Sequence, residues 1–287
     1  MTGTFHTEAL PHRGGLAAVI GAWLVHWLRM AIGFGIYSVG SVLLIASLPA
    51  AFLLCGCRRR RLQTYVRYVC HYFFQVCFWY VRMLRAIDVR MVRHTDSPLA
   101  PIVVCNHISM FDVMTVLAFV PDINTFVKAK FQRVPIVGPL LWAQGYILLD
   151  VNDPDSRIKA YLKAKEVLES GGRIVVFPEG TRTRTGQLGE FQNGVFKLAL
   201  DTGCAISPVV FTSTRPVFAN VPKSLVKNLS LVTYRMHVMP QVKAPLTTET
   251  AGRTAVSQFR KQVHGRFVEW LSAPWVPEWQ RTIKGRV

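Results

Sequence analysis

Apolar residues dominate the N-terminal part of the chain in a pattern typical of a membrane segment. Residues 30–57 contain no Lys, Arg, Asp or Glu, and a helix needs roughly 20 apolar residues to cross a bilayer. Four arginines, Arg58 to Arg61, follow directly, and the positive-inside rule keeps such a cluster on the cytoplasmic side. The pattern therefore predicts a membrane helix over residues 30–57, with the rest of the chain on the cytoplasmic side.

Other arrangements fit the same stretch. Pro49 and the glycines at 33, 35 and 40 permit a kinked or re-entrant helix. Residues 16–28 are also apolar and could pair with residues 30–57 as a helical hairpin. A long helix buried in a soluble protein has a similar composition, but the flanking arginines favour the membrane.

Residues 65–86 show a different pattern, in which polar side chains recur at steps of three and four. They are Arg67, His71, Gln75, Arg82 and Arg85, and Phe78 interrupts the stripe. The other faces carry Tyr, Phe, Trp, Val and Leu. This periodicity predicts an amphipathic helix that lies at the bilayer surface, packs on the catalytic domain, or does both.

After Asp88 short apolar runs alternate with helical patterns. This alternation predicts an α/β fold with a mixed, mostly parallel sheet flanked by helices. The predicted strands are residues 101–105, 125–127, 146–149, 173–177, 206–211 and 231–239. The predicted helices run from a turn at 106–112 to about 119, and over 153–170, 193–201 and 251–271. Residues 1–87 are thus predicted to be a membrane-anchoring helical segment and residues 88–287 an α/β domain.

The net charge of the chain indicates which classes of molecule it can bind. The net charge is +18, which favours anionic partners such as nucleic acid, an anionic bilayer or phosphate groups. No acidic residue lies between Glu8 and Asp88, where the chain is most apolar. Basic and apolar residues in one segment suit an anionic membrane better than nucleic acid, and no nucleic-acid-binding motif is present. There are too few spanning segments for a transporter.

The six cysteines carry no metal-binding signature. None forms a C-x-x-C pair, and no His/Cys cluster has zinc spacing. We therefore predict reduced thiols and no metal site.

One candidate for acid–base chemistry lies at the end of a predicted strand. His107 follows residues 101–105, and Asp112 follows five residues later in the first turns of a helix. This spacing allows the carboxylate to hold one ring nitrogen of His107 and leaves the other nitrogen free to accept a proton. An isolated pattern of this kind also fits a helix N-cap with an incidental histidine.

A second candidate follows the strand at 173–177. The turn Pro178-Glu179-Gly180-Thr181-Arg182 continues as Thr183-Arg184. It offers backbone N–H groups, hydroxyls and a guanidinium, which together can bind a phosphate. Alone it is equally consistent with an ordinary basic loop.

In combination the two motifs resemble the glycerolipid acyltransferase family, of the 1-acyl-glycerol-3-phosphate acyltransferase type. Weaker blocks agree with the resemblance: Lys128-Ala129-Lys130 leading to residues 135–138, residues 145–150, and Ile206-Ser207-Pro208. The resemblance covers about residues 102–211, and an N-terminal membrane segment is also typical of the family.

The resemblance implies a membrane-bound enzyme that transfers a fatty-acyl group to a lysolipid hydroxyl, most readily 1-acyl-glycerol-3-phosphate. His107 would act as general base and Asp112 would orient it. N–H donors near residues 178–180 would stabilise the oxyanion, and Glu179 would order the loop. The substrates would be bound by Glu179, Gly180, Thr181, Arg182, Lys128 and Lys130. Acyl-CoA or acyl-carrier protein would be a co-substrate, with no metal or bound cofactor. A bacterial protein of this kind would lie at the inner membrane.

The sequence departs from the family at Val151. This position usually carries an arginine implicated in acceptor binding, and the nearest substitutes are Arg133 and Arg157. The departure leaves open another acceptor, such as a lyso-aminolipid or a lysophospholipid with a larger head group. A catalytically inactive membrane adaptor is a further alternative, which the intact His107 and Asp112 disfavour.

Overall fold

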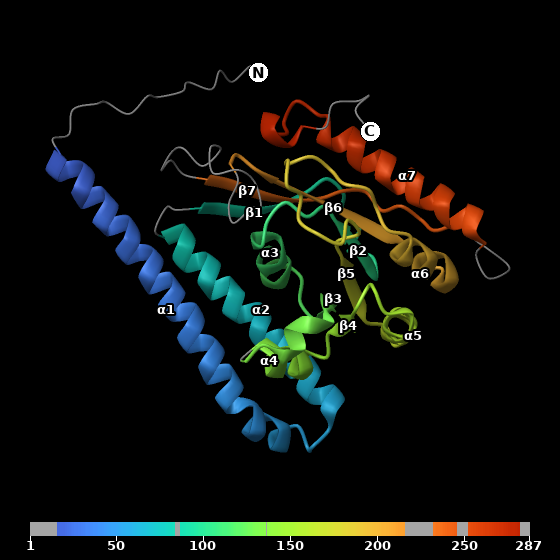
Figure 1. The fold of residues 1–287 in the computed structure, drawn as a ribbon, viewed down its shortest axis with the longest axis horizontal. Helices are drawn as coiled ribbons and strands as arrows, with labels where there is room; N and C mark the ends of the chain where they lie inside the picture. Colours follow the sequence, from blue (N-terminus) through green and yellow to red (C-terminus); the bar gives the residue numbers. More distant parts are fainter. Residues whose placement is uncertain (1–15, 84–86, 136, 216–231, 246–251, 282–287) are drawn as a thin grey trace.

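The centre of the protein is a seven-stranded sheet with the order β1-β7-β6-β2-β5-β3-β4. The computed structural model describes residues 16–83, 87–135, 137–215, 232–245 and 252–281. Every strand pair is parallel except β6 and β7, which are antiparallel. The predicted mixed, mostly parallel sheet is therefore confirmed (Figure 1). The strands are β1 Ile87–Arg93, β2 Ile102–Cys105, β3 Ile123–Lys128, β4 Ile147–Leu149, β5 Arg173–Val176, β6 Ile206–Ser213 and β7 Val232–Val238.

Helices cover both faces of the sheet. One face packs against α5 Pro154–Glu169, α6 Gly194–Thr202 and α7 Arg253–Leu271, and the other against α2 Arg59–Met83 and α3 Phe111–Phe119. The sequence of strand β2 is a continuous apolar run because helices cover both of its faces. Ile102 and Val104 face the first layer, Val103 and Cys105 face the second, and all four are buried. A parallel strand buried on both faces requires this composition.

Local sequence signals set the bounds of several helices. Asp153 caps α5, since its Oδ1 accepts a hydrogen bond from Asp155 N at 3.0 Å, and Pro154 occupies the first turn. The helix ends before Gly171, whose φ of +79° few other residues adopt. These are the bounds that the sequence predicts, within one residue. Residues 231 and 251, which begin two predicted elements, lie outside the described residues.

The N-terminal apolar segment is one continuous helix, α1 Leu16–Leu54. The alternative prediction of a hairpin between residues 16–28 and 30–57 is therefore wrong, whereas a re-entrant position in a bilayer stays a prediction. No helix breaker separates the two halves, because Leu28, Arg29 and Met30 join them. The chain reverses only beyond α1, where Gly56 has a φ of +66°. Within α1, residues Ala31–Leu54 are long and apolar enough to cross a membrane by length and composition.

Helix α2 begins at Arg59 rather than at residue 65, and residues 84–86 lie outside the described residues. It packs on α3 and α4, as one of the two predicted arrangements requires. The polar stripe, however, faces the protein in part. His71 is buried and Arg67 is largely covered, whereas Gln75 and Arg82 are exposed. The outward face is instead apolar and aromatic, with Tyr65, Tyr68, Tyr72, Val76, Trp79 and Met83 exposed.

Four elements of the described residues have no counterpart among the predicted ones: β1, α4 Val137–Gln144, the 3₁₀ turn η1 Ala129–Arg133 and a 3₁₀ turn near the C-terminus. Strand β1 alternates charged and apolar residues at the edge of the sheet, where one side needs no strand partner. Helix α4 contains Pro139, which is tolerated because it lies in the first turn. A second 3₁₀ turn, η3 Glu278–Gln280, lies near the C-terminus.

Candidate active site

His107 and Asp112 form a hydrogen-bonded pair at the carboxyl end of β2. Nδ1 of His107 lies 2.8 Å from Oδ2 of Asp112. The same oxygen accepts hydrogen bonds from Ile108 N and Ser109 N, each at 2.8 Å. Asp112 is the second residue of α3, so the partial positive charge of the helix N-terminus also favours its carboxylate. The folded-back contact that the spacing predicts is present.

The turn between β2 and α3 is held to the sheet. The side chain of Asn106 accepts a hydrogen bond from Phe211 N at 2.6 Å and donates one to Phe211 O at 3.1 Å, which joins the turn to β6. Ser109 Oγ accepts a hydrogen bond from Phe111 N at 2.9 Å. These bonds orient the turn before any substrate binds.

The two residues of the pair differ in access to solvent. Asp112 is fully buried. Burial raises the pKa of Asp112 above its usual value, while the hydrogen bond and charge of His107 act in the opposite direction. The side chain of His107 is 14% exposed, and its ring stacks on Phe177 with centroids 4.2 Å apart. Within the described residues nothing hydrogen-bonds Nε2, so this nitrogen can accept a proton from a bound molecule.

The loop after β5 is bonded directly to the backbone of His107. Glu179 Oε1 accepts from His107 N at 2.8 Å, and Oε2 accepts from Gly189 N at 2.9 Å. Thr183 N donates to His107 O at 2.8 Å. Glu179 therefore orders the loop by binding two backbone N–H groups, and both of its oxygens point inward. Burial raises the pKa of Glu179 to about 7, and the two backbone donors only partly offset this.

The turn at residues 178–180 has little free donor capacity. Gly180 N donates to Phe177 O at 3.0 Å, and the φ of Gly180 is +69°. Pro178 has no N–H group. Of the three residues in this turn, Pro178 and Gly180 therefore have no free N–H group that could serve as the predicted oxyanion donor.

The predicted substrate-binding residues lie at one edge of the sheet but not all in one place. Gly180, Thr181 and Arg182 belong to the loop that bonds His107, where Thr181 is exposed and Arg182 half-buried. Lys128 ends β3 and Lys130 lies in η1, both exposed. Since β5 separates β2 from β3, these lysines lie on the order of 10 Å to the side of His107.

One polar contact to the pair comes from far along the chain. The hydroxyl of Tyr234, in β7, donates to Oδ1 of Asp112. Tyr234 lies outside every motif described from the sequence, and no local pattern distinguishes it from an ordinary strand tyrosine. Phe177, which stacks on His107, was visible from the sequence only as the last residue of the predicted strand 173–177.

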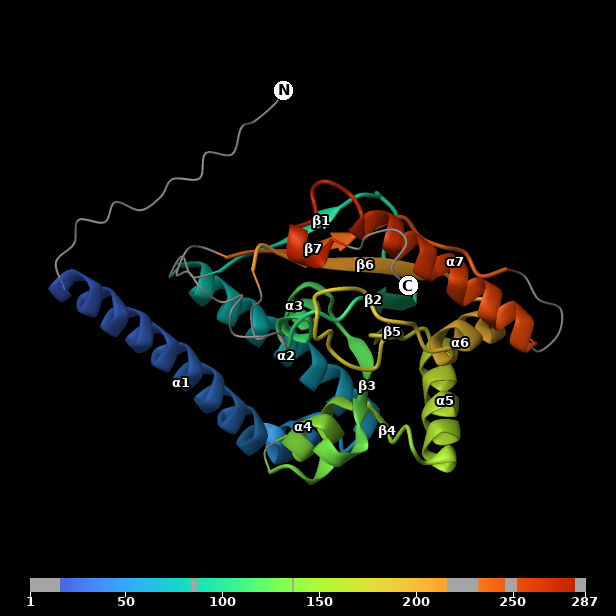
Figure 2. The same ribbon diagram turned by 45° about the horizontal axis from the view of Figure 1, so that its top comes forward.

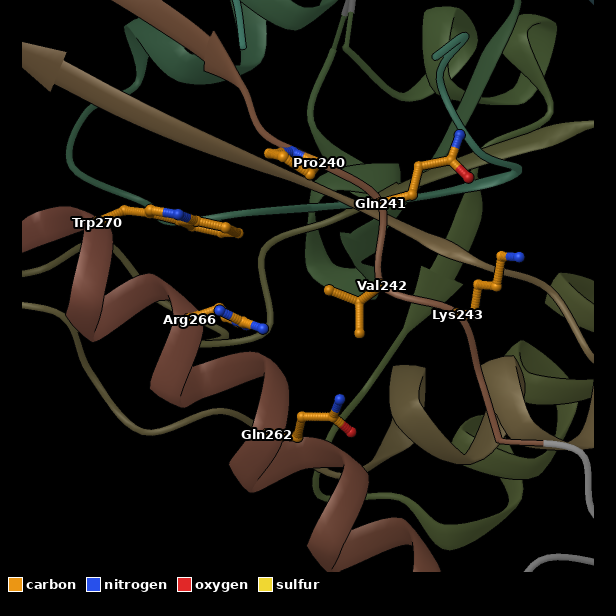
Figure 3. A pocket seen from close by; sticks show the side chains of 7 residues that line it. All are labelled: Pro240, Gln241, Val242, Lys243, Gln262, Arg266 and Trp270. Atoms are coloured by element: carbon orange, nitrogen blue, oxygen red, sulfur yellow. The ribbon is translucent and has the colours of Figure 1, made fainter. Parts of the chain in front are cut away.

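A cavity of about 410 Å³ lies between α7 and the segment after β7 (Figure 3). Gln262, Arg266 and Trp270 line it from the helix, and Pro240 to Lys243 line it from the segment. Val242 bridges to Ile206, which pairs with the first residue of β2, whereas His107 follows the last. The cavity is therefore at the opposite end of the strands from His107. Within the described residues no group of His, Cys, Asp and Glu side chains could hold a metal ion.

Comparison with known proteins agrees with this geometry. The Acyltransferase family model matches residues 88–212. A chloroplastic 1-acyl-sn-glycerol-3-phosphate acyltransferase of Arabidopsis thaliana is 32% identical over 129 residues, which are 45% of this chain and 36% of that protein. The 1-acyl-sn-glycerol-3-phosphate acyltransferase of Borreliella burgdorferi is 31% identical over 163 residues, 56% of this chain and 64% of that protein. The chain thus spans from about a third to just under two thirds of these relatives.

The fold has a solved counterpart. The crystal structure of the 1-acyl-sn-glycerophosphate acyltransferase PlsC from Thermotoga maritima superposes with a TM-score of 0.61 at 21% sequence identity. The match covers 87% of this chain and 98% of that chain. Residues 88–212 are therefore similar in sequence to the Acyltransferase family, and the chain shares its fold with a solved 1-acyl-sn-glycerophosphate acyltransferase.

Proposed function

We propose that this protein is a membrane-bound O-acyltransferase that transfers a fatty-acyl group from acyl-CoA or acyl-carrier protein to a lysolipid, with 1-acyl-glycerol-3-phosphate as the acceptor and phosphatidic acid as the product. The observation that carries the proposal is the His107–Asp112 pair. One ring nitrogen is bonded to a buried carboxylate, and the other has no hydrogen-bond partner among the described residues. The names of the relatives support the choice of acceptor.

The reaction follows from this arrangement. Nε2 of His107 accepts the proton of the acceptor hydroxyl while the hydroxyl oxygen attacks the thioester carbonyl carbon. Asp112 stabilises the imidazolium and keeps a proton on Nδ1. When the tetrahedral intermediate collapses, the carbon–sulfur bond breaks and the thiolate leaves. The proton on Nε2 then passes to the thiolate, which restores the neutral imidazole.

The phosphate of the acceptor is bound, in this proposal, by the loop that bonds His107. Arg182 supplies the charge and Thr181 a further hydrogen bond, while Gly180 shapes the turn through its positive φ, since its N–H group is bonded to Phe177 O. The bonds that Glu179 makes with His107 N and Gly189 N connect this loop to the general base. Glu179 thereby contributes to substrate binding by holding the loop in place. We propose that the exposed Lys128 and Lys130, at the same edge of the sheet, bind phosphates of the donor.

The family usually carries an acceptor-binding arginine at the position of Val151. Arg133 is our candidate for the residue that replaces it. Lys128, at the end of β3, pairs with Leu149, so Val151 follows β4 close to where η1 follows β3. Arg133 ends η1 and is exposed. Arg157 lies farther along, on α5. A different lysolipid is the second candidate acceptor, and an inactive adaptor is disfavoured because the pair is intact.

Membrane attachment is proposed through α1 and α2. Gly33 lies against Tyr80, and Tyr37 packs on Phe73, so the two helices pack side by side in opposite directions. Figures 1 and 2 both show α1 on the side of α2 that faces away from the sheet. The apolar faces of both helices would enter an anionic bilayer and hold the α/β domain at its surface, on the cytoplasmic side if the arginine cluster follows the positive-inside rule.

The experiment that tests the function is an acyl-transfer assay with purified protein in anionic vesicles. Labelled acyl-CoA and acyl-carrier protein are each offered with a panel of lysolipids that includes 1-acyl-glycerol-3-phosphate. His107→Ala is assayed beside the wild type, and we expect it to lose about 10²- to 10⁴-fold in rate. His94→Ala, an exposed histidine at the end of β1, is the matched control and should keep full activity.

Each outcome decides between the candidates. Transfer to 1-acyl-glycerol-3-phosphate that depends on His107 supports the proposal, and makes Val151 a tolerated change. Transfer to another lysolipid alone keeps the mechanism and replaces the acceptor. If no acceptor is acylated, or if His107→Ala keeps full activity, the proposed function is wrong.

A further inference from the structure

The carboxylate of Asp112 divides its hydrogen bonds unequally between its two oxygens. Oδ2 accepts three, from His107 Nδ1, Ile108 N and Ser109 N. Oδ1 accepts one from the hydroxyl of Tyr234. All the donors to Oδ2 come from the turn that holds the motif, whereas the donor to Oδ1 is 122 residues away in the sequence.

Without Tyr234 the carboxylate would have a poorly satisfied oxygen in an apolar environment. Asp112 is fully buried and lies in the cluster of apolar side chains formed by α3 and the sheet, which includes Phe111 and Phe211. A buried carboxylate oxygen without a donor costs free energy, and the residue responds by rotating or by taking up a proton. Either response weakens its hold on the imidazole of His107.

The position of Tyr234 is set firmly by the fold. Tyr234 lies in β7 and pairs with Val89 of β1 on one side and with Ser213 of β6 on the other. Its ring is fully buried and packs edge-to-face on Phe111, with centroids 5.3 Å apart. The side chain of Ser109 also hydrogen-bonds the hydroxyl of Tyr234. The hydroxyl therefore has a fixed position and direction.

We propose that Tyr234 is a positioning residue for the acyltransferase reaction, which holds Asp112 in the orientation and charge state that direct the free nitrogen of His107 to the acceptor hydroxyl. The proposal rests on the proposed function and extends the pair to a chain of three residues from α3, the turn before it and β7. Tyr234 acts through Asp112 and does not touch the substrate.

The test is Tyr234→Phe, which removes the hydroxyl and keeps the ring. At saturating substrate we expect kcat to fall about tenfold with the KM values unchanged, because the ring stays buried away from the substrates. Loss of this donor weakens the hold of Asp112 on the imidazolium of His107. The acid limb of the pH–rate profile should therefore move downward by about one pH unit.

Tyr146→Phe is the matched control. Tyr146 is also largely covered, but its hydroxyl is buried without a hydrogen-bond partner among the described residues. This variant should leave both kcat and the pH–rate profile unchanged. Thermal unfolding of both variants shows whether Tyr234→Phe is folded at the assay temperature. If it is not, the variants are compared by the titration described below, which is carried out at a lower temperature.

A titration of the His107 ring by NMR gives a readout independent of activity. A shifted midpoint in Tyr234→Phe, with no shift in Tyr146→Phe, supports the positioning role even if the wild type acylates none of the lysolipids, in which case the proposed function alone fails. If the wild type is active and Tyr234→Phe changes neither the titration nor the acid limb, the positioning role is overturned. A lower unfolding temperature without either shift also overturns it, since that pattern reflects packing alone.

Discussion

At the scale of single residues, Glu179 shows how a buried carboxylate can organise a loop by accepting two backbone hydrogen bonds. Its two oxygens accept hydrogen bonds from His107 N and Gly189 N. A glutamine has only one acceptor oxygen, and its amide would oppose one of these N–H groups. Glu179 is therefore both a structural connection between two parts of the site and a group whose charge depends on pH.

The stability of the protein should depend on the protonation of Glu179. Because its pKa is raised from 4.5 to about 7, the folded state holds more protons than the unfolded chain between these values. The free energy of unfolding should therefore fall as the pH rises through this window. In Glu179→Gln this part of the slope should disappear, which denaturant unfolding across the window measures. Glu190→Gln, an exposed residue of the same loop, should keep the wild-type slope. An identical slope in Glu179→Gln would contradict the raised pKa.

Arg182 should affect binding of the acceptor more than turnover. We expect Arg182→Ala to raise the KM for 1-acyl-glycerol-3-phosphate about 10- to 100-fold, because a charge-assisted hydrogen bond contributes about 1.5–3 kcal/mol. Steady-state kinetics with varied acceptor checks this result. Arg184→Ala, exposed on the same loop, is the control and should change the KM little. A fall in kcat with an unchanged KM would remove Arg182 from the proposed anion site.

At the scale of elements, α2 joins the apolar helix α1 to the helix that carries Asp112. His71 Nδ1 donates to Leu117 O at 2.8 Å, and Gln75 Nε2 donates to Ala118 O at 3.1 Å. Both carbonyls lie in the last turn of α3, where a helix leaves its C=O groups without internal partners. The part of the polar stripe formed by His71 and the amide of Gln75 therefore supplies donors to carbonyl groups at the end of α3.

Replacing His71 should destabilise the protein. His71→Leu leaves Leu117 O without its donor in a buried place, and we expect the free energy of unfolding to fall by about 1–3 kcal/mol. Chemical denaturation measures the change. Tyr72→Leu alters the exposed face of the same turn and should cost less than about 0.5 kcal/mol. Equal losses in the two variants would show that the inward contact adds nothing specific.

At the scale of the whole molecule, the apolar and basic surfaces meet at the corner between α1 and α2. Leu53 and Leu54 are exposed there, and the exposed cluster Arg58 to Arg61 follows. Arg59 stacks on Trp142 and Arg60 pairs with Glu166, so these two are partly engaged within the protein. A surface of this kind combines insertion of apolar side chains with attraction to anionic head groups.

Binding to anionic vesicles should depend on Arg58 and Arg61. We expect the double variant Arg58→Gln/Arg61→Gln to bind less tightly by about 1 kcal/mol per arginine at low salt. The difference should shrink as the salt concentration rises, because screening weakens exposed charges. Vesicle sedimentation across a salt series measures both effects. Arg253→Gln/Lys261→Gln makes the same change of charge on α7, across the sheet from α2, and should bind like the wild type. Equal losses in the two double variants would mean that net charge alone governs binding.

The sequence by itself determined the features that depend on neighbouring residues. Buried parallel strands are continuous apolar runs, so β2, β5 and β6 were predictable. Helix α5 was predictable because its capping residues are local. His107 and Asp112 were predictable as a pair because five residues of one turn bring them together. Strand β1 and helix α4 were missed because a charged edge strand and a helix with an early proline carry weak local signals.

The tertiary structure decided what depends on contacts between distant segments. Residues on the polar stripe of α2 could equally face water or carbonyl groups, and only the position of α3 settles which. The inward direction of Glu179 depends on where the His107 and Gly189 backbones lie. Tyr234 reaches Asp112 because the antiparallel pairing of β7 with β6 places its side chain there. Periodicity records which residues share a face, but the partner of that face is a property of the folded chain.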